Sequence, residues 1–195
     1  MTGKERVTEK KIKVAWGITG SGDRLSEIIG VMKKLNDQYN SRVDIRVYLS
    51  KAGEQVVKWY RLREEIKQHF GKVYVELNSN SPFLAGDLEL GKFKFLLIAP
   101  ATSNSVAKIA AGITDTLLCN SVIMALKAFV PVYVMPSDYK EGSIMTRLPN
   151  GKELKLRVRR EDAENTRKLS LMENMFVLEK TEDIRTIFEK HFGLS

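Results

Sequence analysis

Short apolar runs alternate with segments of helical periodicity along the first two thirds of this chain, and that alternation restricts the possible folds severely. The segment after the first run has apolar residues at three- and four-residue spacing, which is typical of a helix with one buried face. We expect strands at residues 12–20, 43–50, 72–77, 93–100 and 130–136, and helices at 25–39, 54–70, 104–112 and 115–128. Strands that alternate with helices predict an α/β fold, a Rossmann- or flavodoxin-like three-layer sandwich with a mostly parallel sheet.

The last third departs from this alternation. Residues 147–160 read RLPNGKELKLRVRR, with Asn150 and Gly151 between two strand-like halves, which predicts a C-terminal β-hairpin extension. Side chains alternate between two faces along a strand, so the second half has an apolar face, which we expect to pack on the body of the protein, and a cationic face. The apolar face carries Leu154, Leu156 and Val158, and the cationic face carries Lys155, Arg157 and Arg159.

The 195 residues are expected to form a single domain. Its parts are a core at residues 12–137, the basic hairpin and a last strand at 140–178, and a closing helix at 181–193. That last strand is expected at residues 175–179. Thr181, followed by two acidic residues, is expected to cap the closing helix.

The composition excludes several classes of protein. The longest apolar stretches are far shorter than a membrane span, and the first 13 residues are charged, so we expect a cytoplasmic protein. One cysteine, Cys119, rules out an internal disulfide and a four-cysteine cluster. The two histidines, His69 and His191, have no paired ligand spacing, so we expect no metal site. Any redox chemistry would then require a bound organic cofactor.

The net charge of +8 is concentrated in one segment. Residues 147–160 hold six cations and one carboxylate, a net charge of +5 in fourteen residues. Such a patch favours an acidic partner. A solvated strand face, or a sheet edge protected by cations, would explain the same pattern. Nucleic acid is disfavoured, because the charged face carries no aromatic side chain on which a base would stack.

Glycines and hydroxyl side chains follow the predicted strands. Residues 17–22 read GITGSG, which lacks both the G-x-G-x-x-G spacing and the lysine of a P-loop, so a phosphate site and a tight turn both remain open. Residues 100–105, PATSNS, end another strand. Because carboxyl ends of parallel strands meet at one sheet edge, the two segments together favour a phosphate-bearing ligand. The candidate binding residues are Thr19, Gly20, Ser21, Gly22, Ser50, Thr102, Ser103, Asn104, Ser105 and Ser137.

These motifs resemble those of the homo-oligomeric flavin-containing cysteine decarboxylase superfamily. The likeness covers residues 12–137 and rests on GITGS, on a serine after the second strand, and on PATSNS followed by Lys108, Gly112 and the run from Asp115 to Leu118. The resemblance implies FMN as cofactor, held by the candidate residues named above. It also implies homo-oligomers, either trimers or multiples of three.

The chain departs from the catalytic pattern of that superfamily. Gly86 stands where the decarboxylases carry a catalytic histidine, residues 136–139 read PSDY in place of their substrate clamp, and Ser137 replaces an arginine of the flavin prenyltransferases. We therefore expect no decarboxylase activity. What remains resembles the archaeal flavoprotein branch, and that resemblance implies ferredoxin, or another acidic redox protein, as the electron donor.

Three functions stay open on the sequence alone. The first is an electron-transfer flavoprotein that accepts electrons from ferredoxin, and Lys155, Arg157 and Arg159 would bind the donor. The second is an FMN-dependent reductase of a small molecule such as a dihydropterin. The third is a polyanion-binding module without enzymatic activity. Of the single residues, we expect Trp16 to belong to the core and Asp115 to cap the helix at 115–128.

Overall fold

The structure, a computed structural model, describes residues 10–193 and contains a six-stranded sheet in the order β3-β2-β1-β4-β5-β8. All neighbouring strands in this sheet are parallel. This is the strand order of a doubly wound α/β fold, and it confirms the predicted fold class. The strands are β1 (Ile12–Ile18), β2 (Val43–Leu49), β3 (Val73–Val75), β4 (Leu96–Ala101), β5 (Val132–Pro136) and β8 (Met175–Val177).

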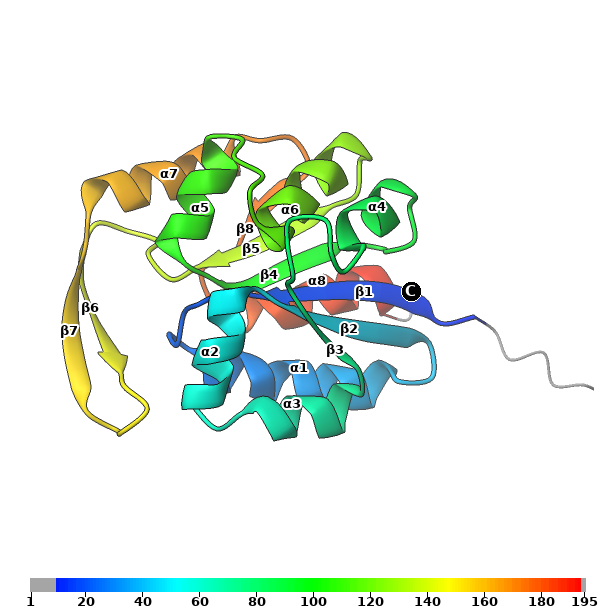
Figure 1. Cartoon of the computed structure of the whole chain (residues 1–195), viewed down its shortest axis with the longest axis horizontal. Helices are drawn as coiled ribbons and strands as arrows, with labels where there is room; N and C mark the ends of the chain where they lie inside the picture. Colours follow the sequence, from blue (N-terminus) through cyan, green and yellow to red (C-terminus); the bar gives the residue numbers. More distant parts are fainter. Residues whose placement is uncertain (1–9, 194–195) are drawn as a thin grey trace, which may run out of the picture.

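Helices cover both faces of the sheet, which makes three layers (Figure 1). One face carries α1 (Leu25–Tyr39), α2 (Lys51–Trp59), α3 (Arg63–Phe70) and α8 (Asp183–Phe192). The other carries α4 (Leu84–Glu89), α5 (Ser103–Ala110), α6 (Leu117–Lys127) and α7 (Arg160–Ser170). The buried apolar residues form two clusters, one on each side of the sheet. A parallel sheet that is buried on both faces explains why its strands are continuous apolar runs.

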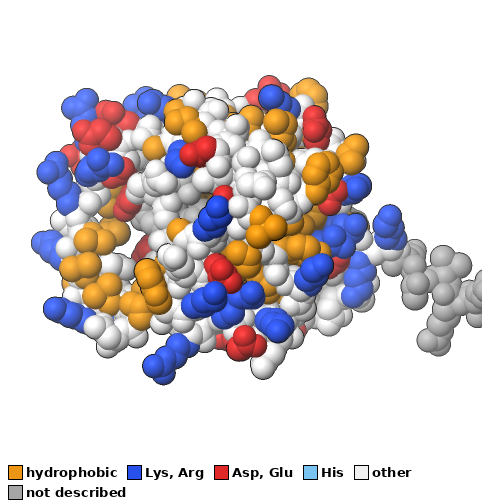
Figure 2. Space-filling view, viewed as in Figure 1, with side chains coloured by type: hydrophobic (Ala, Val, Ile, Leu, Met, Phe, Trp, Pro, Cys, Tyr) orange, Lys and Arg blue, Asp and Glu red, His pale blue; other side chains and the backbone are white. Residues whose placement is uncertain are grey.

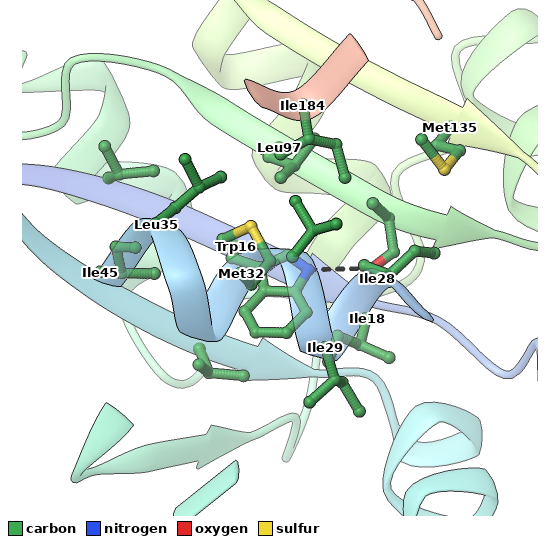
Figure 3. Close-up of a cluster of buried hydrophobic side chains, with 14 of the residues drawn as sticks. Trp16, Ile18, Ile28, Ile29, Met32, Leu35, Ile45, Leu97, Met135 and Ile184 are labelled. Atoms are coloured by element: carbon green, nitrogen blue, oxygen red, sulfur yellow. Dashed lines mark hydrogen bonds between the residues drawn. The ribbon is translucent and has the colours of Figure 1, made fainter. Parts of the chain in front are cut away.

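Trp16 lies fully buried in the larger cluster, as Figure 3 shows, so the expectation that it belongs to the core is confirmed. Its indole N–H donates to the carbonyl oxygen of Ala99 on β4, at 2.8 Å. A buried indole N–H left without an acceptor would cost about 1–3 kcal/mol, so this bond fixes the ring as well as satisfying it. It also joins β1 to β4 near the ends of both strands.

Three sequence expectations about helices are wrong. The helix expected at 54–70 is broken at Arg61, whose backbone adopts a left-handed φ of 58°, so α2 and α3 are separate helices. No glycine or proline marks this break. No helix is expected between residues 70 and 104 or between residues 128 and 181, but α4 and α7 lie in these two intervals.

Thr181 does not cap the last helix. The residue that precedes α8 is Glu182, and it makes no side-chain cap bond. The carboxylate of Asp183 instead accepts from the amide groups of Glu179 and Lys180, at 3.1 and 2.9 Å. The Thr181 hydroxyl is buried and has no hydrogen-bond partner within the described residues. The Asp183 carboxylate thus bonds back to the segment that precedes α8, and the first-turn amides of the helix have no side-chain cap.

The predicted hairpin is present and stands apart from the main sheet (Figure 1). Strands β6 (Gly142–Arg147) and β7 (Glu153–Val158) pair antiparallel, with Ile144 opposite Leu156 and Thr146 opposite Leu154. The Asn150–Gly151 pair lies in the connecting loop, where Gly151 has a φ of 83°. Among residues 10–193, no helix is long and apolar enough to cross a membrane.

His191 gives the fold a predicted dependence on pH. Burial, together with the charges of Lys94 and Lys190, lowers the pKa of its imidazole from the ordinary 6.5. The unfolded chain therefore takes up a proton before the folded chain does, so stability falls as the pH drops through 6.5. The loss is complete once the pH lies below the lowered folded-state pKa.

We expect the urea midpoint of the wild type to fall between pH 7.5 and pH 5, and that of His191→Gln to fall less. The glutamine keeps a polar group opposite the Tyr133 hydroxyl, which lies 2.9 Å from the imidazole Nε2. Denaturation monitored by circular dichroism across this pH range provides the measurement. Equal pH dependence in the two proteins would show that His191 does not couple folding to protons.

Candidate functional site

The chain reverses its direction of travel across the sheet between β1 and β4. From β1 it proceeds outward to β2 and β3, and from β4 it proceeds the other way to β5 and β8. In open α/β sheets, ligands bind at such a switch point, outside the carboxyl ends of the strands. The segments that follow β1 and β4 here are the GITGSG and PATSNS segments that the sequence singled out.

Thr19 joins these two segments. Its hydroxyl donates to the carbonyl oxygen of Pro100 at 2.9 Å and accepts from the amide of Thr102 at 2.8 Å. The residue is 2% exposed. Both hydrogen-bonding roles of this predicted cofactor residue are therefore used within the protein, and they set the spacing between the two loops.

The ten predicted binding residues line two adjoining cavities, which share Gly20 and Thr102. The first cavity, of about 320 Å³, holds Thr19, Ser50, Asn104 and Ser105 as well as the shared pair. The second, of about 280 Å³, adds Ser21, Gly22, Ser103 and Ser137. Residues from four separate loops are thus brought together as the sequence predicted.

Three helices begin at the first cavity, and each has a hydroxyl cap. Ser50 accepts from the amide of Gly53 at 2.9 Å, Thr102 from that of Ser105 at 3.2 Å, and Thr116 from that of Cys119 at 3.4 Å. The positive ends of α2, α5 and α6 therefore surround one small space, which favours an anionic group. Thr116 lay within the family motif, but we had not predicted it as a site residue.

Asp115 does not cap α6, contrary to expectation. Its carboxylate accepts two bonds from the ammonium group of Lys108, at 2.8 and 3.0 Å. The cap is the next residue along the chain, Thr116. The lysine and the aspartate of the family motif thus hold each other and link α5 to the start of α6.

Glu76, a residue that the sequence analysis missed, decides which helix end remains open. Its side chain accepts from the amides of Lys51 and Leu117, both at 3.2 Å, and the residue is 7% exposed. Its carboxylate therefore occupies part of the donor capacity of α2 and α6. The first-turn amides of α5, at Ser103 and Asn104, have no acceptor within their helix, so α5 is the end best able to bind an anion.

Close packing around the glycines shapes the second cavity. A Cβ on Gly20 would lie 2.7 Å from the Cβ of Ala52, and one on Gly22 would collide with the Tyr60 hydroxyl. The hydroxyl of Ser137 donates to that of Ser21 at 2.6 Å. Larger residues at the two glycines would push the loop outward, so their small size is needed for the shape of the cavity.

The hairpin forms one wall of the second cavity. Ile144, Leu154 and Leu156 line it, and Leu154 and Leu156 are 38% and 43% exposed. Figure 2 shows apolar side chains gathered on the hairpin, with cations around them. The expectation that this apolar face packs on the body holds for Val158, which is fully buried, and is wrong for the two leucines.

The three hairpin cations do not face outward together. Lys155 and Arg157 lie exposed on the outer face of β7, but β7 ends at Val158 and Arg159 precedes α7. The Arg159 guanidinium donates two bonds to Asp162, at 2.8 and 2.6 Å. This hydrogen bonding lowers the pKa of the Asp162 carboxyl and raises that of Arg159. Arg159 is therefore paired with Asp162 at the start of α7 and does not belong to the cationic face of β7.

A wider hollow, of about 840 Å³, lies at the opposite edge of the sheet. Residues that precede β1, β4 and β5 line it, among them Lys11, Lys94 and Phe129. It has none of the hydroxyl groups and helix starts of the switch point. Residues 10–193 contain no group of three or more side chains that would hold a metal ion, and the described histidines lie in α3 and α8.

Comparison with known families is consistent with this geometry. The Flavoprotein family model matches residues 2–185, so the chain belongs to the Flavoprotein family. Solved structures of FMN-dependent decarboxylases also share its fold, at 14–20% sequence identity. The family model confirms the prediction of a flavin protein, and the decarboxylase structures confirm the fold.

Individual relatives extend across the whole chain. An uncharacterized protein of Methanocaldococcus jannaschii is 50% identical over 92% of this chain and 96% of its own length. A dihydromethanopterin reductase (acceptor) of the same organism is 32% identical over 91% of this chain and 96% of its own. The structure of Burkholderia xenovorans DmrB in complex with FMN, described as a cubic protein cage for redox transfer, has a TM-score of 0.77 and 32% identity, and covers 94% of this chain and 96% of that one.

We predict that Ser105→Leu abolishes most flavin binding. The leucine would fill part of the first cavity and remove a hydroxyl beside the open end of α5. We expect affinity to fall at least tenfold, which corresponds to about 1.4 kcal/mol. Flavin absorbance per protein chain after purification gives the measurement, and Ser41→Leu at an exposed turn serves as the control. Full flavin content in Ser105→Leu would show that the phosphate of the flavin does not bind in the first cavity.

Proposed function

We propose that this protein is an FMN-dependent reductase of a dihydropterin. The observation that carries the proposal is the pair of adjoining cavities at the switch point: one is lined by hydroxyls and a helix end, and the other has an apolar wall. The first fits the phosphate of FMN, and the second fits a flat heterocycle. The dihydromethanopterin reductase with 32% identity over nearly the whole chain supports this choice over electron transfer alone.

In this proposal the first turn of α5, with Ser50, Thr102 and Ser105, binds the FMN phosphate. Ser21 and Ser137, which are bonded to each other across the switch point, lie toward the ring system. FMN, when bound and first reduced by an external electron donor, would supply the two electrons that reduction of a dihydropterin to a tetrahydropterin consumes together with two protons. The apolar wall of the hairpin limits the access of water to this space.

Tyr60 holds the hairpin over the cavity. Its hydroxyl donates to the carbonyl oxygen of Arg147 at 2.7 Å, which ties the residue after α2 to the end of β6. Gly22 allows this approach, because any side chain there would meet the Tyr60 ring. The cavity wall is therefore positioned by one bond to the body of the protein.

The position at which the resemblance implies a catalytic histidine is Gly86. Gly86 lies within α4, and even a Cβ at this position would collide with the ring of Phe83. A histidine in place of Gly86 would therefore displace the Phe83 ring, which is largely exposed. We propose that the protein has no decarboxylase activity on peptidyl cysteine or phosphopantothenoyl cysteine.

An electron-transfer role is the second candidate, and the outer face of β7 favours it. Lys155 and Arg157 are exposed there, and no carboxylate of the described residues lies within ion-pair distance of either. Exposed cations beside a flavin pocket would steer an acidic donor such as ferredoxin to it. This donor would also serve the reductase, since the dihydropterin reaction needs a source of electrons.

We further propose a homo-oligomer built from trimers. Large apolar side chains are exposed between β3 and the end of α4, namely Leu77, Phe83 and Leu90. Contiguous exposed apolar surface is typical of subunit interfaces. Light scattering of the purified protein would give the mass of the assembly, and a monomer at micromolar concentration would contradict this proposal.

The reductase activity is tested in the absence of oxygen. We expect the FMN-loaded protein, after chemical reduction, to be reoxidised by one equivalent of 7,8-dihydropterin and to yield tetrahydropterin. Stopped-flow absorbance of the flavin and chromatography of the product provide the measurements. If the flavin stays reduced with dihydropterin but transfers electrons to an acceptor protein, the reductase proposal fails and the electron-transfer role remains.

The donor surface is tested by Lys155→Ser combined with Arg157→Ser. We expect flavin reduction by reduced ferredoxin to slow about tenfold at low salt, because exposed charges act mainly on the rate of association. The difference should shrink once the Debye length falls below about 8 Å. Lys67→Ser combined with Lys127→Ser, which removes the same charge from exposed positions elsewhere, is the control. Equal slowing in both variants would show that net charge alone matters.

A further inference from the structure

Asp138 places a carboxylate in the wall of the second cavity, directly after β5. Its Oδ2 accepts from the hydroxyl of Ser103, the first residue of α5. Its backbone carbonyl accepts from the hydroxyl of Thr166 on α7, at 3.0 Å. Two helices therefore hold this residue in place. It belongs to the PSDY segment that replaces the substrate clamp of the decarboxylases, and the proposed cofactor site does not use it.

The charge of Asp138 has no cationic partner within the described residues. The guanidinium of Arg159 is bonded to Asp162. Asp23, the other carboxylate of the cavity, differs because it forms an ion pair with Arg24 at 3.1 Å. A carboxylate oxygen accepts two hydrogen bonds, so the Ser103 hydroxyl leaves Asp138 with free acceptor capacity on both oxygens.

The rest of the cavity restricts what this carboxylate would bind. Ile144, Leu154 and Leu156 form its apolar wall, so a ligand there must present apolar ring faces and a hydrogen-bond donor edge together. The 2-amino-4-oxopyrimidine ring of a pterin has both. Its N3–H and 2-amino group point the same way and match the two oxygens of a carboxylate, as in a bidentate guanidinium pair.

We propose that Asp138 is the specificity-determining residue that binds the N3–H and 2-amino edge of the dihydropterin. This inference rests on the proposed reductase function and adds the side chain that recognises the substrate. The Ser103 hydroxyl orients the carboxylate, and the hairpin leucines contact the ring face. The residue selects a 2-amino-pyrimidine over a 2-oxo-pyrimidine, because the 2-oxo group would place an acceptor against an acceptor.

The experiment compares 7,8-dihydropterin with the matching dihydrolumazine, in which a 2-oxo group replaces the 2-amino group. For Asp138→Asn we expect kcat/KM for the dihydropterin to fall about 10- to 100-fold, mostly through KM. The value for the dihydrolumazine should hold or rise, since the asparagine amide donates to a 2-oxo group. The preference for the amino compound should thus drop at least tenfold. Asp23→Asn, in the same cavity but at an ion-paired carboxylate, should keep the wild-type preference.

Flavin content, melting temperature and flavin reduction potential are measured on each variant. If Asp138→Asn keeps the wild-type preference, or if Asp23→Asn is the variant that loses it, the proposal is overturned. It is equally overturned if Asp138→Asn loses FMN while the preference is unchanged, because the carboxylate then contacts the cofactor. The asparagine is close in size to aspartate and keeps an acceptor for Ser103, so the variant is expected to fold.

A binding measurement separates this inference from the reductase proposal. If the reduced wild type reduces neither compound, the reductase function fails, and calorimetric titration of the FMN-loaded protein with oxidised pterin and lumazine still tests Asp138. If the wild type binds pterin more tightly than lumazine and Asp138→Asn does not, the result supports Asp138 as the residue that recognises the 2-amino group. Equal affinity of the wild type for both compounds overturns it.

Discussion

The contact between the β1 and β4 loops is the constraint on which the site depends. The Thr19 hydroxyl bonds to both Pro100 and Thr102, and the Trp16 indole bonds to Ala99 one step deeper in the core. These are buried bonds between segments about 80 residues apart in the chain, so breaking them would leave polar groups unsatisfied in an apolar interior. They fix the distance between a glycine-rich loop and the start of α5, and both cavities lie along this junction.

In the first cavity, a carboxylate of the protein itself and a bound anion would compete for the same amide donors at the helix starts. Three helix starts create a strongly positive space, and Glu76 takes an amide from two of them. The buried carboxylate is stabilised by these donors, and they in turn are satisfied when no ligand is bound. The remaining helix, α5, presents its first turn to the ligand. A single acidic residue from the end of β3 thus directs an anion to one of three similar sites.

The hairpin combines two surfaces that the alternation of a strand keeps apart. The inner face of β7 closes a cavity with leucines, while the outer face presents Lys155 and Arg157 to solvent. Because the two faces belong to the same strand, a donor bound outside and a ring bound inside would be separated by one layer of backbone. The Tyr60 bond to Arg147 keeps this layer beside the switch point.

The sequence by itself determined the α/β class and the positions of the strands, and it predicted ten binding residues that the fold gathers at the switch point, because apolar periodicity and strand-end chemistry are local patterns. Only the tertiary structure decided the break at Arg61, the helix at 84–89, the commitment of Arg159 to Asp162, and the roles of Glu76, Thr116 and Asp138. Glu76 and Asp138 bond to partners distant in sequence, and the break at Arg61 is a backbone conformation that no glycine or proline signals. Arg159 and Thr116 bond to residues three positions away, where the sequence offers several competing partners. Whether a polar side chain caps a helix, pairs with a cation or faces a cavity is set by its neighbours in space.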